Sequence, residues 1–326
     1  MIPIDGRIGG GQVLRSALTL SLVTGEPFRI TDIRANRSRD GLLRQHLTAA
    51  RAAAEIGSAD TEGLSLGSRR LFFRPKGIAG GHYAWDIGSA GSTSLVLQTV
   101  LPALRFAEGP STVSVSGGTH NPSAPPFDFL DRMWAPLLGV DLELERRGFV
   151  PEGGGLVRAS IEPGGIEKIE RPDRGKIKRL RARALVCGLP ASIGERELRV
   201  LNNELDLRSG EVEGVEDEGP GNALFIEAEC KHAVLMWCGF GELRKRAEEV
   251  ARDLVRSVKR TLQADVPVDE HQADQLVLLG ALGEGARFRT TRPSAHLESN
   301  AAVIEAFTGR SVSCERINKR AWEVVV

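Results

Sequence analysis

Aromatic residues are scarce in this chain of 326 residues: they make up 5% of it, with a single tyrosine, Tyr83. A surface that binds nucleic-acid bases mainly by stacking them on aromatic rings is therefore not expected. Net charge is also lacking, because 43 Lys and Arg balance 43 Asp and Glu. Without a basic field over the whole protein, a long polyanion would not be held nonspecifically. Any contact with a nucleotide or nucleic acid must come from a local cluster of arginines.

Cysteines and long apolar runs are the next features that the chain has little of. The four cysteines form no CxxC pair and have no histidine at zinc spacing, which argues against a structural metal site and a disulfide framework. No run approaches the ~18 apolar residues of a membrane span. Residues 1–7 place Asp5 and Arg7 where a signal peptide needs an apolar stretch. We expect a cytoplasmic protein with reduced thiols and no membrane contact.

One pattern recurs along the chain and predicts the fold. A Gly-rich or polar turn leads into a long amphipathic stretch and then into a short β-rich run, at residues 9–30, 88–116 and 273–290. This repeat predicts β/α units in an α/β (α+β) fold. It also predicts three helix N-termini, whose unpaired N–H groups could together line an anion site. For any single copy, glycines that merely connect two elements remain the simpler interpretation.

The composition changes between the second and third copies. Residues 176–189 alternate like a strand, the spacing of Ser192 and Glu195 is typical of a helix capping box, and residues 209–221 read as a charged loop. Two short strands and a helix follow, with apolar positions of period 3.6 from Leu243 to Leu262. The opposite face of that helix is rich in Lys and Arg, which usually indicates a solvated surface. We predict a core of residues 1–175 and 266–326, interrupted by a small α+β domain at 176–265.

The densest cluster of charge lies at residues 33–46. Four arginines in eleven residues, Arg34, Arg37, Arg39 and Arg44, could bind phosphate through their guanidinium groups or could form an ordinary solvated loop. Asp40 could cap the helix that follows. Arg15 favours the phosphate hypothesis, because it follows a triple-Gly turn inside an apolar helix and needs an anionic partner there.

Among the six histidines, His296 is the one placed for chemistry, between a predicted strand and a predicted helix. A largely neutral imidazole can attack phosphorus and form a phosphoramidate. By spacing alone, a structural role at the start of the helix is the commoner one. We expect His46 to pack in the core, and His82 and His232 to be exposed.

Motifs distributed over the whole chain resemble those of RNA 3'-terminal phosphate cyclases. The first three are Asp5-Gly6 with residues 9–18, the block 33–47, and Gly88-Ser89-Ala90-Gly91-Ser92 with residues 95–98. The others are residues 117–126, 151–155, 273–276 and 293–297, all in the order of that family. The resemblance implies three β/α units like those of enolpyruvyl transferases, with an inserted small α+β domain.

The resemblance also implies an ATP-dependent reaction. His296 would form a covalent adenylate, the adenylate would pass to an RNA 3'-phosphate, and the 2'-OH would close a 2',3'-cyclic phosphate with release of AMP. The implied ATP-binding residues are Gln98, Pro125, His271, Gln272, Ala273, Asp274 and Gln275, with Pro125 and His271 on either side of the adenine. The implied phosphate-binding residues are Gln12, Arg15, Arg34, Arg37 and Gln45.

One departure from the family concerns its divalent cation, Mg²⁺ or Mn²⁺. The family usually has a Glu before the Gly run, whereas residues 5–12 form a loop about two residues shorter that lacks it. If this deletion is real, Mg²⁺ activation is in doubt, and Asp5 is only a speculative substitute for the missing Glu. Whether the loop is truly shorter stays open, as do the metal ligands.

Two alternatives to a cyclase remain. A noncatalytic relative that binds RNA or ribosome-assembly partners should lack the histidine nucleophile, and an enolpyruvyl transferase should lack the insertion and the arginine block. The expected partners of a cyclase are ATP and RNA 3'-phosphate ends, and the chain could form a homodimer. Because the net charge is zero, we expect RNA binding to depend only weakly on salt.

Overall fold

The first 80 residues form a four-stranded sheet with two helices. The computed structural model describes residues 1–217 and 219–326. In order, this first unit consists of β1 (Ile2–Asp5), the short 3-10 helix η1 (Gly6–Ile8), α1 (Gly11–Thr24), β2 (Phe28–Thr31), α2 (Arg44–Ile56), β3 (Asp60–Glu62) and β4 (Leu71–Arg74). The strands are ordered β1-β2-β4-β3, with β1 and β2 parallel and the other pairs antiparallel.

The second unit repeats this arrangement. It consists of β5 (His82–Asp86), α3 (Thr93–Leu104), β6 (Ser111–Gly117), the helical turns α4 (Phe127–Phe129), η2 (Leu130–Trp134) and α5 (Ala135–Leu138), β7 (Val140–Arg146) and β8 (Gly155–Ile161). The order is β5-β6-β8-β7, again with a parallel first pair and antiparallel others.

The third unit is split by a long insertion after its first strand. It consists of β9 (Ile169–Arg171), α8 (Glu270–Leu282), β14 (Ala286–Thr290), α9 (Ala295–Thr308), β15 (Ser313–Arg316) and β16 (Trp322–Val325), in the order β15-β16-β14-β9. Its first two strands are also parallel and the rest antiparallel. The three units share one topology, which confirms the predicted α/β repeat; the likeness to enolpyruvyl transferases stays a prediction.

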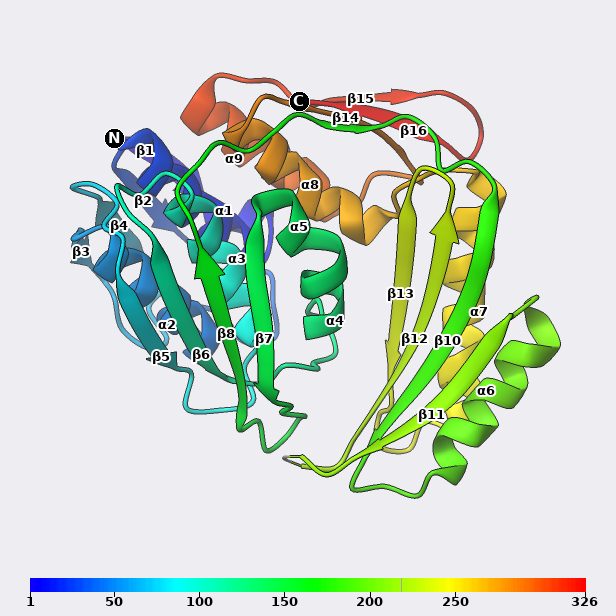
Figure 1. Ribbon diagram of the computed structural model, residues 1–326. Helices are drawn as coiled ribbons and strands as arrows, with labels where there is room; N and C mark the ends of the chain where they lie inside the picture. Colours follow the sequence, from blue (N-terminus) through cyan, green and yellow to red (C-terminus); the bar gives the residue numbers. More distant parts are fainter. Residues whose placement is uncertain (218) are drawn as a thin grey trace.

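Helix α1 lies at the centre of the helical layer, where it contacts α2, α3, α8 and α9 (Figure 1). Its apolar residues explain this position, because Leu14, Leu18 and Leu20 are fully buried. The helix ends at Gly25, whose φ of 75° is left-handed and whose N–H binds the carbonyl of Ser21. In the part of the chain that the structure describes, no helix is long and apolar enough to cross a membrane.

The insertion forms a fourth sheet covered by two helices (Figure 1). Its elements are β10 (Ile177–Cys187), α6 (Ser192–Glu204), β11 (Ser209–Val215), β12 (Gly221–Cys230), β13 (Val234–Phe240) and α7 (Ala247–Ala264), with the strand order β11-β10-β12-β13. One face of the sheet packs on α6 and α7. From the other face, Leu185, Phe225 and Met236 belong to the same apolar cluster as Phe149 of the core. The division at 176 and 265 remains a prediction about independent folding.

Four local predictions were wrong. The charged segment 209–221 contains β11, which pairs in parallel with β10 at the edge of the sheet, so its polar residues belong to a half-solvated strand. Helix α7 starts at Ala247, and Leu243 is 94% exposed. Ser192 is already helical, and no side chain caps α6. Asp40 pairs with Arg69 at 3.3 Å, while the residue before α2 is Leu43.

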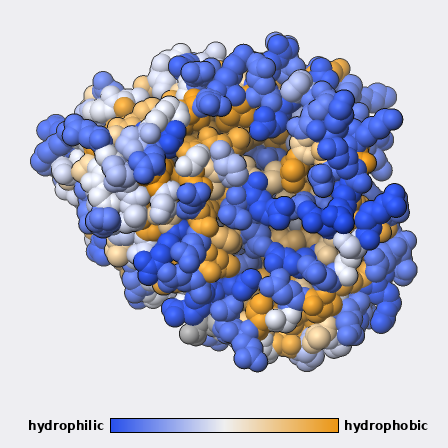
Figure 2. Space-filling model, in the orientation of Figure 1, coloured by the Kyte–Doolittle hydropathy of each residue, from blue (hydrophilic) through white to orange (hydrophobic). Residues whose placement is uncertain are grey.

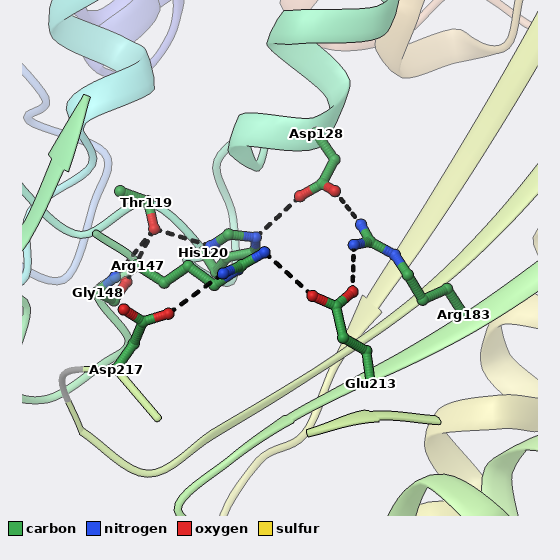
Figure 3. Close-up of polar contacts among 8 residues, drawn as sticks. All are labelled: Thr119, His120, Asp128, Arg147, Gly148, Arg183, Glu213 and Asp217. Carbon is green, nitrogen blue, oxygen red and sulfur yellow. Dashed lines mark hydrogen bonds and ion pairs between the residues drawn. The ribbon is translucent and has the colours of Figure 1, made fainter. Parts of the chain in front are cut away.

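A chain of polar contacts links the second unit to the insertion (Figure 3). Asp128 accepts a hydrogen bond from the ring of His120 at 2.9 Å and pairs with Arg183 of β10. Glu213 of β11 binds Arg183 at 2.6 Å and Arg147 at 3.2 Å. Arg147 also contacts Asp217 at 3.3 Å. Three carboxylates and two guanidinium groups therefore alternate across this interface.

The aromatic surroundings of His120 close the same interface. This buried ring stacks on Phe149 at 5.2 Å between centroids and meets the edge of Phe225 of the insertion at 6.2 Å. The hydroxyl of Thr119 lies 2.8 Å from the other ring nitrogen. The interface combines apolar packing with paired charges, so it holds the insertion in one orientation on the second unit.

Candidate active site

The first turn of α9 fixes the position of His296. The Oγ of Ser294 accepts hydrogen bonds from the backbone N–H groups of His296 and Leu297, at 3.1 and 3.0 Å. The same hydroxyl donates to Oδ1 of Asp274 at 2.5 Å. The Ser294 cap therefore joins the helix that carries His296 to the second turn of α8.

Asp274 is buried where three helices meet. Asn300 of α9 donates from Nδ2 to the backbone carbonyl of Asp274 at 3.0 Å, and it accepts from Ser16 of α1 at 2.7 Å. Burial raises the pKa of the Asp274 carboxyl to about 7, although the hydrogen bond from Ser294 opposes this shift. The side chain is consequently poised to titrate near neutral pH.

Arginines from two segments converge beside this anchor. Arg15 is half-buried in the first turns of α1, and a Cβ on Gly10 would lie 3.1 Å from the guanidinium of Arg37. Arg34 has a left-handed φ of 58°, and its buried Nε has no hydrogen-bond partner. Within residues 1–217 and 219–326, no carboxylate lies within 4.0 Å of these three guanidinium groups. Such a set of unpaired cations is suited to a bound anion.

The pKa shifts in this cluster have a common origin. Burial, followed by the charge of Arg34, lowers the pKa of Arg15 to about 10. Burial and the charge of Arg37 also lower the pKa of Arg34. The charged forms of Arg15 and Arg34 are thus disfavoured by burial and by a neighbouring charge, and an anion bound beside them would offset both effects.

His46 lies directly behind the Gly run, as a packing residue. Its Nδ1 accepts the backbone N–H of Leu43 at 3.3 Å, which leaves the proton of the neutral ring on Nε2. Burial and the charges of Arg15 and Arg34 lower its pKa to about 3. A Cβ on Gly11 would collide with this ring, so a glycine is needed there.

His296 itself is half-buried and faces the arginines. Burial lowers the pKa of its ring, and the charges of Arg37, Arg15 and His271 lower it further. The imidazole is therefore neutral at pH 7, which is the form with a lone pair for nucleophilic attack. A neutral nucleophile beside unpaired cations is suited to a reaction at a phosphoryl centre.

Five of the predicted residues line one small cavity next to this cluster: Gln12, Arg15, Gln98, Asp274 and Gln275. The side chains of Gln98 and Gln275 meet in a hydrogen bond of 2.7 Å between α3 and α8. The cavity measures about 20 Å³, enough for a water molecule but not for a base or a sugar. A nucleotide bound to these groups would therefore lie over the mouth of the cavity.

The other predicted residues lie around this centre. Gln45 accepts the backbone N–H of Ser92 at 3.0 Å, which ties α2 to the start of α3. His271 is exposed near His296, whereas Ala273 is fully buried. Gln272 lines a separate cavity of about 400 Å³ between α8 and the insertion. Pro125 is half-buried in the loop before α4, and its place beside adenine, opposite His271, stays a prediction.

Asp5 is the carboxylate of the N-terminal loop, and it forms a salt bridge with Arg7. Oδ1 accepts both the backbone N–H and Nε of Arg7, at 2.9 and 3.0 Å, and Oδ2 accepts Nη2 at 2.8 Å. The side chain of Arg7 lowers the pKa of Asp5. Apart from residue 218, the chain has no group of three or more His, Cys, Asp or Glu side chains placed to hold a metal ion. Asp5 is thus paired with Arg7, and its role as a substitute for the family's metal ligand stays a prediction.

Sequence reasoning missed several residues that build the site. Ser294 and Asn300 connect α9 to α8 and α1, and His120 and Asp128 hold the insertion. Ser294 could have been found, because a serine directly before a helix is a common cap. Asn300 binds Ser16, which is 284 residues away in the sequence, and Asp274, which is 26 residues away. No local sequence pattern indicates either partner.

The fold and the site together define an α/β protein with a half-buried histidine beside a cluster of arginines that have no acidic partners among the described residues. Residues 7–314 match the family model described as RNA 3'-terminal phosphate cyclase. A protein of Ectopseudomonas mendocina, named RNA 3'-terminal phosphate cyclase, is 47% identical over 331 aligned residues, covering 99% of this chain and 97% of its own. A protein of Pseudomonas fluorescens with the same name is 47% identical over 332, with the same coverage. The chain belongs to the RNA 3'-terminal phosphate cyclase family, which confirms the resemblance and the expected class of enzyme, a ligase.

Proposed function

We propose that this protein uses ATP to convert an RNA 3'-terminal phosphate into a 2',3'-cyclic phosphate through a covalent adenylate on His296. The observation that supports this most is the neutral, half-buried ring of His296 beside Arg15 and Arg37, with its backbone fixed by Ser294. Family membership and the names of the two relatives support the overall reaction.

In the first step, a lone pair on the His296 ring attacks the α-phosphorus of ATP. A P–N bond forms, the bond from the α-phosphorus to the bridging oxygen breaks, and pyrophosphate leaves. Arg15, Arg34 and Arg37 neutralise the charge that accumulates on the phosphoryl oxygens. Gln12, Gln98, Asp274 and Gln275 would hold the nucleotide from the polar mouth of the small cavity.

In the second step, an oxygen of the RNA 3'-phosphate attacks the adenylate, the P–N bond breaks, and His296 is regenerated. In the third step, the 2'-OH attacks the 3'-phosphorus, loses its proton, and expels AMP as the ring closes. The 3'-phosphate and the attacking 2'-OH belong to the same ribose. The protein therefore mainly has to hold the 2'-OH in line with the leaving AMP. A divalent cation, Mg²⁺ or Mn²⁺, would supply further charge neutralisation when bound, and its ligands stay undefined.

The product assay separates this proposal from a noncatalytic relative. A 3'-phosphorylated oligoribonucleotide is incubated with the protein and ATP, with and without Mg²⁺ or Mn²⁺. We expect one AMP for each phosphatase-resistant cyclic end. RNA binding without ATP-dependent AMP release would support the noncatalytic alternative. A cytoplasmic location and a homodimer stay predictions of the same proposal.

A further inference from the structure

A basic groove lies between the last turns of α7 and the C-terminal hairpin β15–β16. Its volume is about 950 Å³, near the upper end of the ~300–1,000 Å³ of small-ligand pockets. Figure 1 places the end of α7 near the turn of the hairpin, behind the strands of the insertion, and Figure 2 shows mostly hydrophilic residues on the near face of the same part of the molecule. One wall comes from residues 256–264 and the other from residues 291–322.

The α7 wall carries three basic side chains, and each has an acidic partner. Arg256 pairs with Asp253, Lys259 with Glu204 at 3.0 Å, and Arg260 with Glu270. All three basic residues are exposed, so these pairs contribute little stability and can exchange for phosphate contacts.

The opposite wall is basic without compensation. Arg292, Lys319 and Arg320 are exposed, and no carboxylate lies within 4.0 Å of them in the described part of the chain. Arg316 donates to the backbone carbonyl of Asn318 at 3.0 Å. Seven basic side chains thus line the groove, against the single carboxylate of Glu298. The protein has no net charge, but the lining of this groove is strongly basic.

The groove ends next to the candidate active site. Thr291, Arg292 and Pro293 line it and lead directly to Ser294, which caps the helix of His296. Glu270, which accepts a hydrogen bond from Thr291 at 2.8 Å, is followed by His271. Trp322 is half-buried and lines the groove, and an indole ring is suited to stacking on a base.

We propose that this groove binds the RNA strand upstream of its 3' end, with internal phosphates on Arg292, Lys319 and Arg320 and one base on Trp322. The inference rests on the proposed function, because it needs the terminal phosphate to lie at His296. It revises the sequence-based expectation that the basic face of the helix is merely solvated and that RNA binding depends weakly on salt. The groove makes binding depend on RNA length, because a short substrate reaches the active site without filling it.

Fluorescence anisotropy with 3'-phosphorylated oligoribonucleotides of two and ten nucleotides tests this proposal. The variant K319A/R320A removes two unpaired groove charges. The matched control K178A/R199A removes two exposed charges of the insertion outside the groove. We expect K319A/R320A to bind the ten-mer at least about tenfold more weakly and to lower the slope of log K against log salt by about 1.4. The control should bind like the wild type, and the dinucleotide should bind all three proteins equally.

Two results would overturn the groove proposal: equal ten-mer affinities in the groove and control variants, or an equal loss for the dinucleotide. The proposed function has a separate readout, which is the covalent adenylate formed by the wild type from ATP without RNA. Its absence, together with length-dependent binding lost in K319A/R320A, would refute the catalytic mechanism and leave the groove in place.

Discussion

Ser294 donates a hydrogen bond of 2.5 Å to the buried carboxyl of Asp274 while it caps the helix that carries His296. The backbone of His296 is thereby linked to Asp274, whose pKa burial raises to about 7. In an unfolded chain this pKa would be about 3.9. Between these values the folded protein keeps a proton that the unfolded chain releases, so the free energy of unfolding falls as pH rises from about 4 to 7.

The variant D274N should remove this pH dependence. Asparagine keeps the acceptor for Ser294 but does not titrate. We expect the free energy of unfolding of D274N, measured by urea titration between pH 5 and 7.5, to fall less with pH than that of the wild type. The rate of adenylate formation should change between pH 6 and 8 in the wild type and less in D274N.

Glu197 offers a matched control for that experiment. It is buried in the insertion, accepts a hydrogen bond from Asn222 at 3.0 Å, and has a pKa that burial raises to about 7. E197Q should flatten the stability profile as D274N does, but should keep the wild-type pH profile of adenylate formation. An altered activity profile in E197Q would argue against a specific role for Asp274.

Arg37 is the exposed member of the cluster formed by Arg15, Arg34 and Arg37, and its loss should reduce the proposed activity. Removing a charge-assisted contact of about 1.5–3 kcal/mol lowers kcat/KM by roughly 10- to 150-fold. Arg39 lies on the same loop and is also exposed, and its backbone carbonyl accepts a hydrogen bond from Arg34 at 3.0 Å. R39A should therefore behave like the wild type in steady-state kinetics. Equal kinetics for R37A and the wild type would return the loop to the solvated interpretation.

The interface of the insertion should depend on Asp128. Burial alone would raise the pKa of this carboxyl, but the hydrogen bond and charge of His120 and the charge of Arg183 lower it to about 2. The paired carboxylate therefore contributes stability of about 2 kcal/mol above pH 4, which is lost as the pH falls towards 2.

The variant D128N should be destabilised by this amount at pH 7 in urea unfolding. D141N is the control, because Asp141 is exposed and has no basic partner within 4.0 Å among the described residues. Equal stability of both variants would mean that the network contributes nothing net, as buried ion pairs sometimes do.

The elements that the sequence predicted correctly depend on local signals. Gly25 and the apolar residues of α1 define that helix and its end within one stretch, and the same holds for α8, which ends at Gly283. Strand β11 escaped prediction, because its alternation is mostly polar and its identity comes from pairing with β10. The local pattern shows which secondary structure a segment can form. Where the pattern is ambiguous, as in β11, contacts with residues distant in the sequence decide which structure forms.

The candidate site divides in the same way. His296 and the arginine block could be identified from motifs of the family. The convergence of Arg15 with Arg34, and the contact of Gln98 with Gln275, arise from helix packing between units. The basic groove lies between α7 and a hairpin near the C-terminus. Because these elements are far apart in the sequence and the net charge of the chain is zero, composition did not indicate a basic surface there.

The covalent adenylate is the central claim, and labelling tests it most directly. The protein is incubated with ATP labelled in the α-phosphate, denatured, and examined for acid-labile label. The account predicts one labelled histidine in the wild type and no label in H296A, while H232A, which changes an exposed histidine paired with Asp173, keeps it. Label that persists in H296A, or a wild type that takes up none, would contradict the mechanism.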